Sequence, residues 1–208
     1  MTPLGRIALV GNSLPRRCGI ATFTTDLQRA IASSRPHLTA SIVAMTDHGQ
    51  AYDYPGSVVL QIRDDAVEAY VRAAALLNAS RFDIVCLQHE FGIFGGEAGS
   101  HILELLSRLT MPVVTTLHTV LAEPTAAQHA VMDRIVEMSS KIIVMANKGR
   151  ELLRSVYRVP DEKIEVIAHG IPDFPFVEPD AAKAKLGFGG RPVILTFGLL
   201  SRARASRS

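Results

Sequence analysis

The chain has 208 residues, of which 48% are hydrophobic and 20% charged, so it exceeds one average domain and falls short of two. The formal net charge is +2, but three arginines lie in the last seven residues, and without them the charge is −1. A slightly acidic body with 6% aromatic residues and no basic stripe argues against a nucleic-acid-binding protein. No apolar run approaches the roughly 20 residues of a membrane-spanning helix, so we expect no integral membrane segment.

The N-terminal residues 1–6 run directly into an apolar segment and lack the basic region, apolar core and cleavage site of a secretory signal. We therefore expect a cytoplasmic protein. The two cysteines, Cys18 and Cys86, are too few for a disulfide framework and do not have the spacing of a zinc site. We expect no structural metal.

Apolar runs typical of buried strands alternate with stretches of helical period, which is the pattern of crossover units in a parallel sheet. Strands are expected over residues 6–11, 40–45, 58–62, 83–87, 112–117, 141–145 and 164–168. Helices are expected over residues 21–32, 66–77 with a cap at Asp64 or Asp65, 100–109, 125–138 and 149–156. Most of the strands are continuous Val/Ile/Leu runs, which indicates burial on both faces. The fold class is therefore α/β, with a doubly wound, mostly parallel Rossmann-like sheet.

The domain organisation is expected to change after residue 171, where a proline-rich stretch begins. We assign residues 1–171 to the Rossmann-like domain and residues 172–190 to an interdomain linker. Residues 191–208 combine the first strand of a second domain with an aberrant tail made of Arg, Ala and Ser alone. The rest of that domain is expected to be missing, and a strand over 191–200 without sheet partners should promote self-association.

Polar residues follow the carboxyl ends of successive strands. They are residues 12–19, 47–48, 88–90, 118–119, 147–148 and 169–170. In an open parallel sheet these ends line one edge, where the loops form the ligand crevice. His89, His118 and His169 therefore share that edge. Each histidine alone could equally be a loop cap, but the coincidence of three favours a binding site.

The first of these loops ends at Gly19, just before the first helix. Glycine permits close approach of the backbone at the positive end of a helix, which suits a phosphate. Arg16 and Arg17 would strengthen such a site, although two exposed arginines are also typical of a solvated loop. The Gly-x-Gly-x-x-Gly fingerprint is absent after the first strand, so a nicotinamide enzyme is set aside.

Residues 88–99 combine polar groups at a strand end with four glycines and two aromatic residues. Aromatic faces beside hydrogen-bonding side chains suit a polyhydroxylated ligand, and Gly92, Gly95 and Gly96 would allow the loop to close over it. The alternative is a plain glycine-rich turn in which Phe91 and Phe94 belong to the core.

Together these segments resemble the N-terminal half of a family 4 glycosyltransferase, a family with the two-domain GT-B fold. The resemblance rests on the loop at Gly19, the strand end TTLHT at 115–119, the segment ANKGRELL at 146–153, and VIAHGI at 166–171. The segment QHEFGIFGG at 88–96 resembles a subgroup often described as mannosyltransferase-like.

The resemblance implies a retaining, metal-independent transfer of a sugar from a nucleotide diphosphate sugar, GDP- or UDP-linked, to an acceptor. No separate cofactor is expected, and the acceptor is a glycan, a lipid or a small polyol. The catalytic residue, in contact with the donor sugar near its reacting carbon, would be His118. The residues implied to bind the donor phosphates are Arg16, Arg17 and Gly19. The residues implied to bind the acceptor are Gln88, His89, Glu90, Gly95 and Gly96. The residues implied at the cleft floor and hinge are Asn147, His169 and Gly170.

The sequence departs from the family after Ser201, where the family has basic phosphate ligands and, further on, two donor-binding glutamates. This chain alone is therefore expected to be inactive, as the acceptor half of an enzyme. The alternative is a non-catalytic α/β module that binds a sugar or a partner through the same edge.

Overall fold

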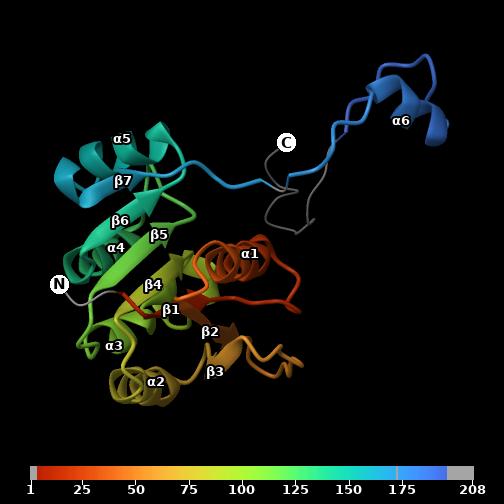
Figure 1. Ribbon diagram of the computed structural model, residues 1–208. Helices are drawn as coiled ribbons and strands as arrows, with labels where there is room; N and C mark the ends of the chain where they lie inside the picture. Colours follow the sequence, from red (N-terminus) through yellow and green to blue (C-terminus); the bar gives the residue numbers. More distant parts are fainter. Residues whose placement is uncertain (1–3, 172, 196–208) are drawn as a thin grey trace. The chain divides into compact units, whose positions relative to one another are not determined.

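The structure, a computed structural model, describes residues 4–171 and 173–195. Its strands form a seven-stranded sheet in the order β3-β2-β1-β4-β5-β6-β7, and every neighbouring pair is parallel (Figure 1). The strands are β1 (Arg6–Gly11), β2 (Thr39–Thr46), β3 (Val58–Arg63), β4 (Ile84–His89), β5 (Val113–Leu117), β6 (Lys141–Val144) and β7 (Ile164–Val166). The α-helices are α1 (Gly19–Ser34), α2 (Val67–Ala79), α3 (Ile102–Leu106), α4 (Ala126–Met138), α5 (Asn147–Ser155) and α6 (Pro179–Lys185).

The predicted α/β fold with a Rossmann-like sheet is confirmed, and the sheet is entirely parallel in these seven strands. Each predicted strand overlaps an observed one, with ends that differ by one or two residues. The chain order reverses between β1 and β4, so the carboxyl ends of these two strands flank the switch point of the sheet. Ligands of such sheets bind in the crevice at that point.

The sheet is covered on both faces, as the continuous apolar strands predict. On one face, Ile7, Leu9 and Ile42 pack with Leu27 and Ile31 of α1. On the other face, a larger core cluster joins the sheet to α2, α3 and α4. Its members include Ala8, Val10, Val43, Tyr70, Leu105 and Ile135.

The start of α2 corrects the predicted cap. The N-cap is Ala66, and no side chain caps this helix end. Asp64 instead accepts a hydrogen bond from the Tyr70 hydroxyl through its backbone oxygen, at 3.0 Å, and the carboxylate of Asp65 pairs with Arg63. The carboxylate of Asp65 thus has another partner, whereas the buried Oδ1 atom of Asp64 has no hydrogen-bond partner among the described residues. The helix predicted over 125–138 is α4, which begins one residue later. Thr125 is its N-cap in a reciprocal capping box.

The chain divides into two compact units, Met1–His169 and Gly170–Ser208. In the second unit, α6 lies within the expected linker 172–190 and was not predicted. Its start is favoured by Pro179 at the first helical position, and Lys185 in its last turn complements the helix dipole. Residues 191–195 belong to no strand, and the remainder of the expected strand, 196–200, lies outside the described residues. The expected self-association through this segment stays a prediction.

Within residues 4–171 and 173–195, no helix is both long enough and apolar enough to cross a membrane.

Gly11 fixes how closely β1, β4 and α1 approach one another. A Cβ atom on this residue would lie 2.9 Å from Cβ of Gln88 and 3.3 Å from Oγ1 of Thr24. Any side chain here would push β4 or α1 away from the end of β1.

We predict that Gly11→Ala lowers the free energy of unfolding by about 1–3 kcal/mol, the usual cost of overpacking a well-packed site. The matched control is Gly19→Ala, because nothing lies within 4 Å of a Cβ there and Gly19 is in a helix. Alanine at that position should be neutral or stabilising by up to about 1 kcal/mol. Urea unfolding of both variants measures the difference, and equal effects would contradict the tight contact at Gly11.

Candidate functional site

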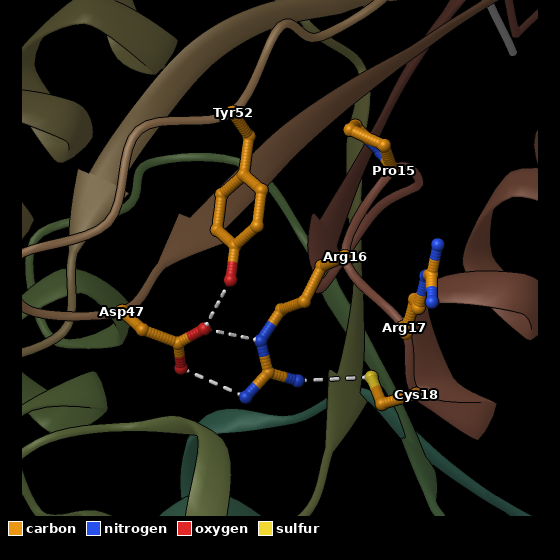
Figure 2. Close-up of a pocket in the computed structure, with 6 residues that line it drawn as sticks. All are labelled: Pro15, Arg16, Arg17, Cys18, Asp47 and Tyr52. Atoms are coloured by element: carbon orange, nitrogen blue, oxygen red, sulfur yellow. Dashed lines mark hydrogen bonds and ion pairs between the residues drawn. The ribbon is translucent and has the colours of Figure 1, made fainter.

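Arg16, in the loop between β1 and α1, forms a two-point ion pair with Asp47 at the end of β2. The Nε atom of Arg16 lies 2.5 Å from Oδ2 of Asp47, and Nη2 lies 2.8 Å from Oδ1 (Figure 2). The Tyr52 hydroxyl donates to the same Oδ2 at 2.8 Å. The hydrogen bond from Arg16, opposed by burial and supported by Tyr52, holds the pKa of the Asp47 carboxyl below its ordinary value. The charge of Arg16 is therefore already neutralised within the chain.

These residues line an open pocket with a volume of about 470 Å³. The lining consists of Pro15, Arg16, Arg17, Cys18, Asp47 and Tyr52 (Figure 2). Arg17 is exposed, and it makes no ion pair within the part of the chain that the structure describes. Of the two predicted phosphate-binding arginines, Arg17 is thus the one whose charge is available to a ligand.

Cys18 is the N-cap of α1, and Gly19 is the first residue of the helix. The Sγ atom of Cys18 accepts hydrogen bonds from the backbone N–H of Ala21 at 3.3 Å and from Nη1 of Arg16 at 2.9 Å. Open space surrounds the position of a Cβ on Gly19. The sequence placed this residue at the helix start, and the structure leaves its backbone open to a ligand on that side.

Gln88 and His118 meet at the carboxyl ends of β4 and β5. Oε1 of Gln88 lies 3.2 Å from Nε2 of His118, and the backbone N–H of His118 donates to the carbonyl of His89 at 3.0 Å. Burial, assisted by the neighbouring charge of His169, lowers the pKa of His118 to about 4. His118 is therefore a neutral imidazole at pH 7.

Phe23 on α1 links two of the predicted histidines. Its ring packs edge-on against His118 at 4.8 Å and against His169 at 5.2 Å between ring centroids. Phe23 was not among the predicted site residues, because an aromatic residue inside an amphipathic helix has the same pattern as a core residue.

His89 lies on the opposite face of the sheet from Gln88. Successive side chains of a strand alternate between faces, and His89 accordingly stacks on Phe94 and meets the edge of Phe91. Its ring is completely buried, and burial lowers the pKa of His89 to about 3. His89 therefore lies in the core with both phenylalanines, and its role toward an acceptor stays a prediction.

Glu90 is fixed at the start of the loop that follows β4. Its Oε1 accepts a hydrogen bond from the backbone N–H of Phe91 at 3.1 Å, and its Oε2 accepts one from the hydroxyl of Thr119. The half-buried carboxylate is thus held next to the strand end that carries His118. Each of its oxygens retains a further lone pair for a ligand.

Gly95 and Gly96 anchor the loop rather than leaving it loose. A Cβ on Gly95 would lie 2.0 Å from the backbone oxygen of Asp64, and Gly96 has φ +80° and sits against His101. The backbone N–H of Gly95 also donates to the hydroxyl of Tyr70 at 3.2 Å. Close packing and backbone conformation account for both glycines, and their role toward an acceptor stays a prediction.

The remaining predicted residues lie at the ends of β6 and β7. Asn147 is the exposed first residue of α5, and His169 ends the first compact unit, while Gly170 begins the second. Their assignment to a cleft and hinge stays a prediction. Among the described residues, no group of three or more His, Cys, Asp or Glu side chains is placed to hold a metal ion.

The sequence profile of Glycosyltransferase Family 4 matches residues 17–173. The chain belongs to this family. No curated protein matches the sequence. Among solved structures, a glycosyltransferase from Rickettsia africae ESF-5 is similar to this chain with a TM-score of 0.59 and 14% identity. The match covers 89% of this chain and 50% of that protein, so the chain spans about half the length of the solved relative. This likeness shows a shared fold.

A second solved structure is an alpha-glucosyltransferase in complex with UDP and a 13-mer DNA containing a central A:G mismatch. It is 14% identical, and the match covers 69% of this chain and 38% of that one. Its TM-score of 0.44 is too low to establish a shared fold.

In this family 4 chain, the ion pair between Arg16 and Asp47 should make stability depend on pH. The folded pKa of Asp47 lies below the ordinary value of 3.8, so its contribution is complete above that pH and is lost as the pH falls through the folded pKa. We predict that Asp47→Asn is less stable than the wild type at neutral pH. The difference should shrink as the pH falls below about 4 and through the folded pKa of Asp47.

Urea unfolding from neutral to acidic pH measures this dependence. The control is Asp53→Asn, since Asp53 is an exposed carboxylate in the same loop and makes no ion pair among the described residues. A difference between Asp47→Asn and the wild type that stays constant down to pH 2 would contradict the assigned ion pair.

Proposed function

We propose that the chain is the acceptor-side part of a glycosyltransferase that moves a sugar from a nucleotide diphosphate sugar to an acceptor hydroxyl. The observation that carries this proposal is the pairing of a neutral His118 with Gln88 beside the switch point of a family 4 sheet. Because the chain spans half of the solved relative, the activity is proposed for the whole protein. In a retaining transfer, the bond from the anomeric carbon to the phosphate oxygen breaks. The acceptor oxygen bonds to the same face, and its proton passes to the departing phosphate.

The donor diphosphate is proposed to lie at the start of α1. Arg17 offers there a guanidinium that forms no ion pair with the described residues, and Gly19 leaves the backbone at the positive end of the helix open. Arg16 contributes less, because Asp47 already neutralises it. Arginine side chains and a helix dipole can stabilise the charge of a departing diphosphate without a metal ion. This supports a metal-independent reaction, and the resemblance to family 4 implies a UDP- or GDP-linked sugar as the donor.

The acceptor is proposed to lie against Glu90. Its carboxylate is held by Phe91 and Thr119, so it is already oriented when a ligand arrives. A fixed carboxylate accepts strong hydrogen bonds from sugar or polyol hydroxyl groups. This chemistry suits a glycan, a glycolipid headgroup or a small polyol.

We predict that the chain binds methyl α-mannoside or myo-inositol at millimolar concentration, and that Glu90→Gln weakens this binding about tenfold or more. Loss of a charged hydrogen-bond acceptor has an effect of this size. Glu97→Gln is the matched control, because Glu97 is an exposed carboxylate of the same loop segment. Ligand-observed NMR measures the affinities, and absence of binding by any polyol would contradict the acceptor assignment.

We predict that the 208-residue chain alone transfers no sugar. We also predict that the protein isolated from its native host converts a UDP- or GDP-hexose with retention of anomeric configuration. EDTA should leave the rate unchanged, since no metal ion takes part. Proton NMR of the product and the intact mass of the protein are the measurements. An inverted product or inhibition by EDTA would contradict the mechanism, and polyol binding without transfer would favour a non-catalytic module.

A further inference from the structure

Gln88 is a fully buried amide at the carboxyl end of β4. Its Cβ and Cγ lie 2.9 and 3.4 Å from the position that a Cβ would take on Gly11, so the side chain is confined on that side. Oε1 faces Nε2 of His118 at 3.2 Å, whereas Nε2 of Gln88 finds no hydrogen-bond partner in the described part of the chain. A buried amide with an unpaired N–H group is unfavourable for folding. Among the described residues, the amide of Gln88 therefore makes one polar contact, between its Oε1 atom and Nε2 of His118.

The orientation of this amide determines which nitrogen of His118 carries the proton. A carbonyl oxygen only accepts hydrogen bonds, so the facing Nε2 must be the N–H, and a neutral imidazole then has its lone pair on Nδ1. The backbone hydrogen bond from His118 to the carbonyl of His89 and the edge-on ring of Phe23 restrict the imidazole from two further directions. Nδ1 makes no hydrogen bond to any of the described residues.

The titratable groups around His118 leave its ring neutral. His169 is the neighbour whose charge would oppose protonation. His89 is buried on the other face of the sheet, and Glu90 is engaged by Thr119 and Phe91. No carboxylate forms an ion pair with His118 in the described part of the chain. The ring therefore presents a lone pair, not a positive charge.

We propose that Gln88 is a positioning residue that holds His118 as the Nε2–H tautomer, so that Nδ1 accepts a hydrogen bond from a hydroxyl group of the donor sugar. The inference rests on the proposed function and on the contact between His118 and the donor sugar that the resemblance to family 4 implies. A lone pair attracts a hydroxyl group and repels a carboxylate. The site therefore selects neutral hexosyl donors over hexuronosyl donors.

The tautomer is tested by long-range proton–nitrogen NMR of the chain labelled with ¹⁵N-histidine, with the His118 signals assigned by comparison with His118→Asn. The wild type should show a protonated Nε2 and an unprotonated Nδ1 on a ring that stays neutral at pH 7, with a resolved proton on Nε2. In Gln88→Met this proton should exchange too fast to be observed, while the fold is kept. A proton on Nδ1 of the wild type would overturn the proposal, because Gln88 would then be a donor to the ring.

Gln88→Glu distinguishes positioning from simple packing. A carboxylate at this position retains the acceptor and adds a negative charge, which should raise the pKa of His118 by at least one unit, the usual effect of an opposite charge within hydrogen-bond distance. Gln88→Met adds no charge, so it should not raise the pKa of His118 in this way. Equal pKa values of His118 in the two variants would show that residue 88 acts only by filling space and would overturn the proposal.

The specificity is tested by binding of UDP-glucose and UDP-glucuronate to the whole protein isolated from its native host, as the wild type and as Gln88→Glu, measured by saturation-transfer NMR. The wild type should favour UDP-glucose. In Gln88→Glu the preference should fall by roughly tenfold at a pH below the raised pKa of His118, where the ring of the variant is a cation, as expected for one charge-assisted hydrogen bond. An unchanged preference would overturn the inferred selection. Failure of the wild type to bind either compound would contradict the proposed function, while the tautomer would still be decided by the histidine spectra.

Discussion

The alternation of side chains along β4 is the constraint on which the candidate site depends. Because neighbouring residues of a strand point to opposite faces, Gln88 lies on the face covered by α1, where it meets His118. His89 lies on the other face, among Phe91 and Phe94. A shift of one residue in the register of β4 would exchange the faces of Gln88 and His89. His118 would then lose its polar partner Gln88 to the ring of His89, which is now fully buried.

The close approach of β1 and β4 at Gly11 is a second constraint on the site. It allows the end of β1 to lie directly against Gln88 of β4, and the next residue, Asn12, donates to the sulfur of Cys18 at the start of α1. The pocket beside Arg16 and the pair formed by Gln88 and His118 are therefore positioned by the same strand end. A single glycine at the switch point couples the loop that would hold phosphate to the strand that would hold sugar.

The sequence predicts the sheet well because burial on both faces leaves an unmistakable pattern of apolar runs, and it predicts the polar edge because parallel strands end on one side. Side-chain partners are not encoded in that way. The pairing of Arg16 with Asp47 depends on the parallel register of β1 and β2, in which Gly11 is paired with Ala44. The contacts of Gly95 with Asp64 likewise join segments that are distant in the chain. In the sequence, residues 88–90 form one polar cluster, but the alternation of side chains along β4 places Gln88 and His89 on opposite faces of the sheet.

The electrostatics of this edge indicate which part of the chemistry the first unit is suited to. Arg16 is neutralised by Asp47, and His118 is neutral because burial lowers its pKa to about 4. Of the residues that line the pocket, Arg17 alone offers a charge without an ion-pair partner in the described part of the chain. One exposed arginine and a helix terminus provide limited neutralisation of a departing diphosphate, because solvent screens exposed charges. Under the proposed function, this unit therefore supplies oriented hydrogen bonds to sugar hydroxyl groups, and most of the positive charge that the reaction requires must come from groups outside it.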